Sequence, residues 1–149
     1  MHEVRGRLRA FACIAGGEEA PCISGVVKFY ESKWGVLVSA DIFCLPEGNG
    51  IHGFHIHEGE ACTGEGFADT RNHYNPAQRA HPFHAGDLPP LFSCNGRAHM
   101  QVLIGRFQIR EVIGRTVVIH EGPDDFHSQP GGNAGQKIAC GVIRACCRS

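Results

Sequence analysis

The sequence predicts an all-β fold, a sandwich or barrel built from about eight short strands. Apolar and polar residues alternate over short segments that are rich in β-branched and aromatic side chains, and turn sequences separate these segments. No segment of convincing length shows the helical period. The 149 residues are predicted to form a single domain, 1–149, which is long enough to bury its own core.

The expected strands are short, and turn residues separate the first four. Residues 3–14 and 22–30 flank Gly-Gly-Glu-Glu-Ala-Pro, which predicts a hairpin. The turn Leu-Pro-Glu-Gly-Asn-Gly then joins a third strand to a fourth, in which histidines alternate with Phe54 and Ile56. The third to eighth strands are expected at residues 34–43, 51–58, 98–104, 106–113, 115–121 and 137–144.

Two segments lack strand character and predict long loops. The first covers nearly forty residues after residue 58, and the second runs from Gly122 to Gly135. A compact domain seldom contains a structureless loop as long as the first unless something holds it in place. Candidate metal ligands and Cys62 lie in that loop and are expected to hold it.

The first candidate metal site lies within residues 72–87. Pro76, Pro82 and Gly86 exclude one continuous helix, so the ligands are expected on a loop folded around an ion. Three imidazoles and one carboxylate suit tetrahedral zinc, and four protein ligands leave no open position, as in a structural site. The four candidate ligands are His73, His81, His84 and Asp87.

A second candidate site combines histidines from two strands. His55 and His57 lie on one face of their strand with Cα atoms about 6.6 Å apart, so both side chains can reach one ion. His120 closes the apolar strand Thr-Val-Val-Ile-His. Each of these histidines alone is more often a core or surface residue, but six of the ten histidines converging on two sites favours metal binding. The unassigned histidines are His2, His52, His99 and His127.

Charge and hydropathy restrict the expected partners and compartment. The formal net charge of -1 gives no general reason to expect nucleic acid or an anionic membrane as a partner. No apolar run approaches the length of a membrane span. The N-terminal residues lack the apolar core of a secretory signal, so we expect a cytoplasmic protein, or an extracytoplasmic one if a leader was removed.

Five segments resemble the signature sequences of the copper,zinc superoxide dismutase family, in the order in which the family has them. The resemblance covers residues 50–143, and H-A-G-D-L-P is closer to bacterial members. It implies a Greek-key sandwich or barrel of antiparallel strands with two long functional loops. The five segments are G-F-H-I-H-E, N-H-Y-N-P, H-A-G-D-L-P, G-R-T-V-V-I-H-E and G-N-A-G-Q-K-I-A-C-G-V-I.

The resemblance implies one copper and one zinc ion per chain, with His73 bridging them as an imidazolate. Four imidazoles suit copper(II), and three imidazoles with an aspartate suit zinc. Asp124 stands where the family has an aspartate that hydrogen-bonds ligands of both metals and fixes their orientation. The implied copper ligands are His55, His57, His73 and His120, and zinc is completed by His81, His84 and Asp87.

The same resemblance implies an enzyme that converts superoxide to dioxygen and hydrogen peroxide by copper redox cycling. It further implies that zinc is structural, that His73 delivers a proton, and that the cation at position 137 attracts the anion. The family's arginine is Lys137 here, which keeps the charge but loses the planar fork. Gly131 replaces a threonine and predicts a wider entrance, and the segment from His81 to His84 is shorter than in most members.

Two other functions are compatible with these residues. A copper- and zinc-binding module without turnover is favoured by Lys137, and a disulfide-linked structural domain with a vestigial site is disfavoured because all the ligands are present. A metal assay combined with a dismutase assay separates the three functions. A homodimer is compatible with the family, whose dimer contacts vary between lineages.

The resemblance also implies a disulfide between Cys62 and Cys140, which would hold the first long loop. Cys13 and Cys22 flank the first hairpin, which leaves a second bridge open. Cys44 and Cys94 are expected to be buried free thiols, because unpaired cysteine usually behaves as a small hydrophobic residue.

Overall fold

The computed structural model describes residues 6–48 and 50–146. Among them, no helix combines the length and the apolar character needed to span a bilayer. The elements follow the chain as β1 (Arg7–Gly16), β2 (Ser24–Ser32), β3 (Gly35–Phe43), β4 (Ile51–His52), β5 (Phe54–His57), η1 (Glu65–Thr70), β6 (Leu91–Phe92), β7 (Ala98–Ile104), α1 (Ile109–Val112), β8 (Thr116–His120) and β9 (Lys137–Ala145).

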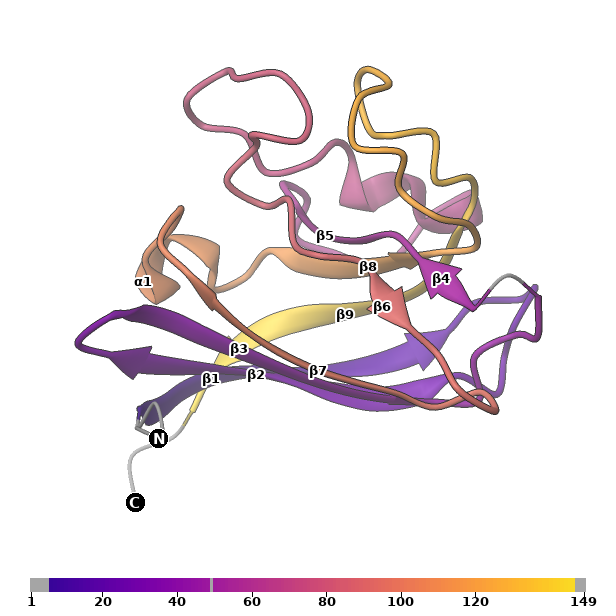
Figure 1. Ribbon diagram of the computed structural model, residues 1–149, viewed down its shortest axis with the longest axis horizontal. Helices are drawn as coiled ribbons and strands as arrows, with labels where there is room; N and C mark the ends of the chain where they lie inside the picture. Colours follow the sequence, from indigo (N-terminus) through magenta and orange to yellow (C-terminus); the bar gives the residue numbers. More distant parts are fainter. Residues whose placement is uncertain (1–5, 49, 147–149) are drawn as a thin grey trace.

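Seven of these strands form one antiparallel sheet in the order β5-β8-β9-β1-β2-β3-β7. The sheet curls into a half-barrel, with the long loops gathered on the side of β5 and β8 (Figure 1). The chain crosses from β3 to β5, returns to β7 at the opposite edge, and crosses again to β8, whereas β1, β2 and β3 pair in chain order, as do β8 and β9. The predicted all-β fold is confirmed.

The core follows from the alternation of side chains along each strand. In β2, Val27 and Phe29 point inward and are fully buried, while their sequence neighbours are partly exposed. The ring of Phe29 meets Phe107 edge-on at a centroid distance of 6.4 Å. The register pairs Val27 with Ala40 and Phe29 with Val38, so adjacent strands place their apolar residues on the same inner face.

The predicted strand at 106–113 was wrong, because this segment contains the helical turn α1. The apolar residues Ile109 and Val112 are spaced for one helical face and both are buried. A capping box fixes the start of the turn: the Gln108 N–H donates to Glu111 Oε2 at 3.0 Å, and the Gln108 side chain accepts from the Glu111 N–H.

The predicted fourth strand, residues 51–58, is divided at Gly53. β4 pairs with β6 in a separate two-stranded sheet, while β5 joins the edge of the large sheet. The Gly53 N–H donates to the Gly122 carbonyl at 2.8 Å, and a Cβ at this position would lie 2.7 Å from the Ala134 side chain. The division therefore lets the second long loop approach the backbone beside the histidine-bearing strand.

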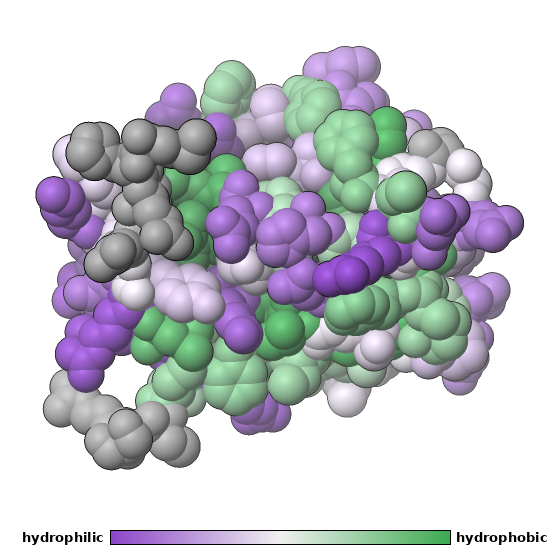
Figure 2. Space-filling model, turned by 60° about the horizontal axis from the view of Figure 1, so that its bottom comes forward, coloured by the Kyte–Doolittle hydropathy of each residue, from purple (hydrophilic) through white to green (hydrophobic). Residues whose placement is uncertain are grey.

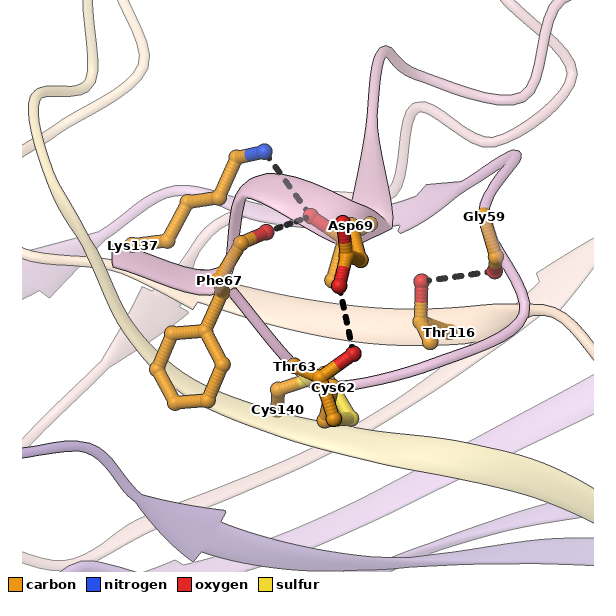
Figure 3. Close-up of a disulfide and its surroundings, with 9 residues drawn as sticks. Gly59, Cys62, Thr63, Phe67, Asp69, Thr116, Lys137 and Cys140 are labelled. Carbon is orange, nitrogen blue, oxygen red and sulfur yellow. Dashed lines mark hydrogen bonds between the residues drawn. A yellow bond between two sulfur atoms is a disulfide. The ribbon is translucent and has the colours of Figure 1, made fainter. Parts of the chain in front are cut away.

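A disulfide holds the first long loop, which contains η1 and, further on, β6. Cys62 is bonded to Cys140 on β9, as predicted, across 78 residues of sequence. Figure 3 shows two supporting contacts on either side: Thr63 Oγ1 donates to Asp69 Oδ2 at 2.6 Å, and Thr116 Oγ1 donates to the Gly59 carbonyl at 3.0 Å. By the chain-entropy relation, closing a loop of this length restricts the unfolded chain and stabilises the folded protein by roughly 4.5 kcal/mol.

The expected burial of Cys44 and Cys94 was wrong, since both are exposed. Each lies in a turn beyond the end of a strand rather than on an inward-facing strand position. A bridge between Cys13 and Cys22 is not formed, and both are free thiols. The register pairs Cys13 with Val26, so Cys22 lies well past its cross-strand neighbour.

Candidate metal centre

The edge strand β5 organises the centre by pairing with the loop that carries the other ligands. The Tyr74 N–H donates to the Ile56 carbonyl at 2.8 Å, and the Ile56 N–H donates to the Gly86 carbonyl at 2.8 Å. These bonds bring His73 beside His57 and Asp87 beside His55. A Cβ at Gly86 would lie 2.2 Å from the Ile56 carbonyl oxygen, so only glycine allows this approach.

Four imidazoles meet at the open side of β5 and β8. A register shift between Ile119 and His120 turns the His120 side chain toward β5, as a bulge at the end of a strand can. His57 Nε2 and His120 Nε2 lie 3.4 Å apart, and the rings of His55 and His73 stack at 4.0 Å. One nitrogen from each member lies within 4.8 Å of the others, and the cluster comprises His55, His57, His73 and His120.

A second cluster lies on the loop side and shares His73 with the first. His73 Nδ1 lies 2.8 Å from Asp87 Oδ1, while His84 Nδ1 lies 3.2 Å from Asp87 Oδ2. His81 Nδ1 is 3.0 Å from the same Oδ2 but lacks hydrogen-bond geometry with it. The members are His73, His81, His84 and Asp87, with one ligand atom of each within 4.8 Å of the others.

Asp124 contacts one histidine of each cluster. Its Oδ2 lies 2.8 Å from His55 Nε2 and its Oδ1 lies 2.7 Å from His81 Nε2, so it fixes the rotation of one ring in each cluster. A Cβ at Gly132, where φ is +79°, would lie 2.1 Å from Asp124 Oδ1. Glycine at this position therefore leaves room for the carboxylate.

Backbone carbonyls orient two further imidazoles. His57 Nδ1 donates to the Arg71 carbonyl at 2.8 Å, and His120 Nδ1 donates to the Gly135 carbonyl at 3.1 Å. Each bond leaves the Nε2 atom, with its lone pair, facing the centre of the first cluster. Arg71 adopts a φ of 60°, unusual for arginine, and this places its carbonyl in reach of His57.

The buried nitrogens that lack a partner fit metal binding. His55 Nδ1 and His81 Nδ1 are buried and make no hydrogen bond, although an unpaired buried polar atom is costly. His55 Nδ1 belongs to the four-imidazole cluster, a donor set that suits copper(II). His81 Nδ1 belongs to the cluster with Asp87, whose three imidazoles and one carboxylate suit tetrahedral zinc.

Burial keeps the imidazoles neutral. It is the largest influence on their titration and lowers the pKa of His55 to about 4 and the pKa of His120 to about 3. It also lowers the pKa of His57, to which the neighbouring His73 adds. Metal binding requires neutral imidazole, so the fold holds these side chains in the protonation state of a ligand.

The two carboxylates are held in their ionised form. Burial raises the pKa of Asp87, but its hydrogen bond with His73 and the neighbouring imidazoles outweigh this and lower it. Burial also raises the pKa of Asp124, but hydrogen bonds with His55 and His81 outweigh this and lower it. Two carboxylates thus compensate part of the positive charge that metal ions would bring.

An open pocket of about 800 Å³ leads to the four-imidazole cluster. Its wall includes Lys137, which the β8–β9 register places opposite His120. Lys137 Nζ donates to Thr70 Oγ1 at 2.8 Å and to the Arg71 carbonyl at 3.0 Å, and Figure 3 shows its side chain reaching toward that loop. On the same wall, a Cβ at Gly131 would lie 3.2 Å from His73 Nε2, so the absent side chain leaves this nitrogen accessible.

Comparison with known protein families matches residues 23–143 to copper/zinc superoxide dismutase. The chain belongs to the copper/zinc superoxide dismutase family. Superoxide dismutase [Cu-Zn] 2 of Aquifex aeolicus is 36% identical over 137 residues, covering 82% of this chain and 80% of that protein. Superoxide dismutase [Cu-Zn] 3 of Arabidopsis thaliana is also 36% identical, covering 96% and 94% of the two chains.

Two solved structures share the fold of this chain. The clock protein EA4 superimposes with a TM-score of 0.80 at 30% identity and covers 98% of this chain and 99% of its own. A double mutant of a SOD-like protein from Bacillus subtilis superimposes with a TM-score of 0.77 at 27% identity, covering 90% and 96%. The half-barrel with its histidine clusters is therefore the copper/zinc superoxide dismutase fold.

All seven ligands expected from the sequence, together with Asp124, lie in this centre. Sequence reasoning missed three groups that position them. The Arg71 and Gly135 carbonyls carry no side-chain signal. His52 was left unassigned, yet it is buried and its Nδ1 donates to the His120 carbonyl at 3.0 Å. Its neighbourhood in the dismutase signature G-F-H-I-H-E was the signal that could have found it.

The lowered pKa of the buried histidines predicts that the metal-free protein is destabilised by acid. Below about pH 6.5 the unfolded chain binds protons at His55 and His120 that the folded protein refuses until about pH 4 and about pH 3. Above that window both states are neutral and these groups contribute no pH dependence. Urea unfolding of metal-free protein should therefore show stability falling by on the order of a few kcal/mol between about pH 7 and about pH 4.

His120→Gln tests this explanation, and His127→Gln is its matched control. The first removes a buried histidine and should flatten the dependence on pH, whereas the second changes an exposed side chain and should leave the slope as in the parent. Equal slopes for all three proteins would contradict the account.

Proposed function

We propose that the two clusters hold one copper and one zinc ion and that this protein is a working superoxide dismutase. The observation that carries the proposal is the shared His73. Its Nδ1 faces Asp87 and His84, which leaves Nε2 for the four-imidazole cluster beside the open pocket. The proposed copper ligands are His55, His57, His73 and His120, and the proposed zinc ligands are His73, His81, His84 and Asp87.

Copper in a four-imidazole site supplies one-electron redox chemistry, which allows one superoxide anion to be oxidised to dioxygen and another to be reduced to hydrogen peroxide. The protein's own contribution is positional and acid–base. Asp124 and the Arg71 carbonyl fix the rings of His55 and His57, so these imidazoles need no reorganisation. His73 Nε2, accessible beside Gly131, is the atom we propose takes up a proton and returns it to the reduced substrate, and solvent supplies the second proton of hydrogen peroxide.

Lys137 supplies the positive charge that attracts the anion. It lines the pocket, and its ammonium group is held by the Thr70 hydroxyl and the Arg71 carbonyl. A fixed cation beside a pocket raises the local concentration of an anionic substrate and its rate of encounter. A lysine lacks the planar donors of arginine, so we propose that Lys137 guides superoxide by charge more than by directed hydrogen bonds.

The second candidate function is a copper- and zinc-binding protein without turnover. Lys137 and Gly131 favour it, because both depart from the family's residues at the pocket. This protein would share the ligands and the metal content, and only its rate with superoxide would distinguish it.

A homodimer is supported by the outer face of the sheet. The register aligns Leu8, Tyr30, Leu37 and Leu103 across β1, β2, β3 and β7, and Leu8 and Leu103 are 38% and 41% exposed. Figure 2, which brings this side of the molecule forward, shows hydrophobic patches among hydrophilic side chains. We propose that a second copy of the chain covers part of this face.

The shared ligand predicts that His73→Ala uncouples the two sites. The variant keeps three copper imidazoles, His55, His57 and His120, but the zinc cluster loses the ligand that connects it to them. It should bind copper, yet its copper(II) spectrum should no longer change when zinc is added, as measured by titration with electron paramagnetic resonance. The parent protein, titrated in the same way, should show the change. A zinc-dependent copper spectrum in the variant would mean that His73 is not the bridge.

Lys137 separates the enzyme from the binding protein. Lys137→Ala should lower the second-order rate with superoxide about tenfold, equivalent to about 1.4 kcal/mol, and should flatten its dependence on salt. Lys137→Arg should restore or raise the rate, because the guanidinium combines the charge with a rigid set of donors. Pulse radiolysis at several ionic strengths, on protein of measured metal content, gives these rates.

Lys33→Ala is the matched control, since it removes the same charge at the turn between β2 and β3, outside the pocket wall. It should retain the parental rate. If Lys137→Ala behaves like this control, Lys137 does not guide the substrate. Metal-loaded parent protein without dismutase activity would leave the binding protein as the function.

A further inference from the structure

Two exposed cysteines that the metal centre does not use lie side by side. The Cys22 thiol donates to the carbonyl oxygen of Cys44 at 3.6 Å, although the two residues are 22 apart in sequence. Both are free thiols and both are exposed. They lie just beyond Ser24 and Phe43, the last cross-strand pair of β2 and β3, so the hairpin itself brings them together.

The electrostatics of the pair agree with contact between the two side chains. A hydrogen bond with the Cys22 thiol raises the pKa of Cys44, and burial and the proximity of a second thiolate act in the same direction. The Cys44 side chain thus tends to keep its proton. Because the thiolate is the attacking form, Cys44 is the poorer first attacker, and it gives up its proton only when it attacks the Cys22 sulfur in the second step.

We propose that Cys22 and Cys44 form a second, reversible disulfide when they react with hydrogen peroxide. The oxidant is the product of the proposed dismutase reaction, so the physiological source of peroxide rests on that function. The dithiol itself does not, since peroxide from any source has the same chemistry. This disulfide differs from the one between Cys62 and Cys140, which is already present in the structure.

The reaction balances without any further reagent. The Cys22 thiolate attacks one peroxide oxygen, the O–O bond breaks, and protonation of the departing hydroxide gives water and a sulfenic acid on Cys22. The Cys44 sulfur then attacks the Cys22 sulfur, an S–S bond forms, the S–O bond breaks, and a second water leaves with the Cys44 proton. Each sulfur loses one electron, and the peroxide gains two.

The new bond would close the β2–β3 hairpin at its open end. Cys44 precedes the buried Leu45, whose N–H donates to the Gly96 carbonyl at 2.9 Å, and the chain then continues into β4 and β5. A bond at Cys44 therefore ties the segment that leads to the metal centre to the start of β2. Closing this loop reduces the freedom of the unfolded chain, so the oxidised protein should be the more stable form.

The chain offers a matched control among its other cysteines. Cys13 is an exposed free thiol on β1. Within residues 6–48 and 50–146, its thiol makes no hydrogen bond with another cysteine. Cys13→Ser should therefore leave peroxide-driven disulfide formation unchanged, whereas Cys22→Ser should abolish it. Both substitutions keep the size of the side chain and change positions that are open to solvent.

The experiment treats the copper- and zinc-loaded protein with a few equivalents of hydrogen peroxide, blocks the remaining thiols, and maps disulfides by mass spectrometry of unreduced peptides. The expected product is a peptide pair joined through Cys22 and Cys44, with the loss of two hydrogen atoms. The thermal midpoint should rise by roughly 5 °C, and mild reduction should reverse the rise. Cys13→Ser should match the parent in both measurements.

Peroxide treatment that leaves Cys22 and Cys44 unlinked, oxidises each one separately, or joins either one to another cysteine would overturn the inference. A second arm measures the dismutase activity of the same preparation. Added peroxide that links the cysteines in a protein without dismutase activity would place the failure in the proposed dismutase function and leave the dithiol standing.

Discussion

The structure depends on one imidazole that two ligand clusters share. His73 can serve both only if its ring is held between three other imidazoles on one side and a carboxylate with two further imidazoles on the other. This constraint explains why so many polar side chains are buried together, including His55, which is fully buried, and Asp87, which is 7% exposed. The buried Nδ1 atoms of His55 and His81 make no hydrogen bond with the protein, which is costly unless they bind metal ions.

The sheet meets this constraint because its edge strand β5 pairs with the ligand-bearing loop. The loop that carries His73 and Asp87 pairs with β5, which otherwise would expose an unsatisfied edge. The Cys62–Cys140 disulfide fastens the same loop to β9, and the shift at His120 turns that side chain inward. Lys137 then occupies the pocket wall because β9 begins opposite His120. The pairing of β5, β8 and β9 therefore fixes where the ligand-bearing loop is attached and where Lys137 meets the pocket.

The strands and ligands could be predicted from the sequence because they depend on local periodicity and on residue types with few roles. The segment at 106–113 could not, because its apolar spacing fits both periods, and the capping box between Gln108 and Glu111 decides for a helical turn. The division at Gly53 depends on the approach of Ala134, a distant residue. The pairing of Cys22 with Cys44 likewise depends on hairpin register, which a cysteine count does not contain.

The central claim is that His73 lies between two different metal ions, and anomalous diffraction tests it most directly. Crystals of protein loaded with copper and zinc would be measured on both sides of each absorption edge. We predict a copper peak enclosed by His55, His57 and His120, a zinc peak enclosed by His81, His84 and Asp87, and the His73 ring bonded to both through its two nitrogens. A single peak, or two peaks of which only one contacts His73, would contradict the account.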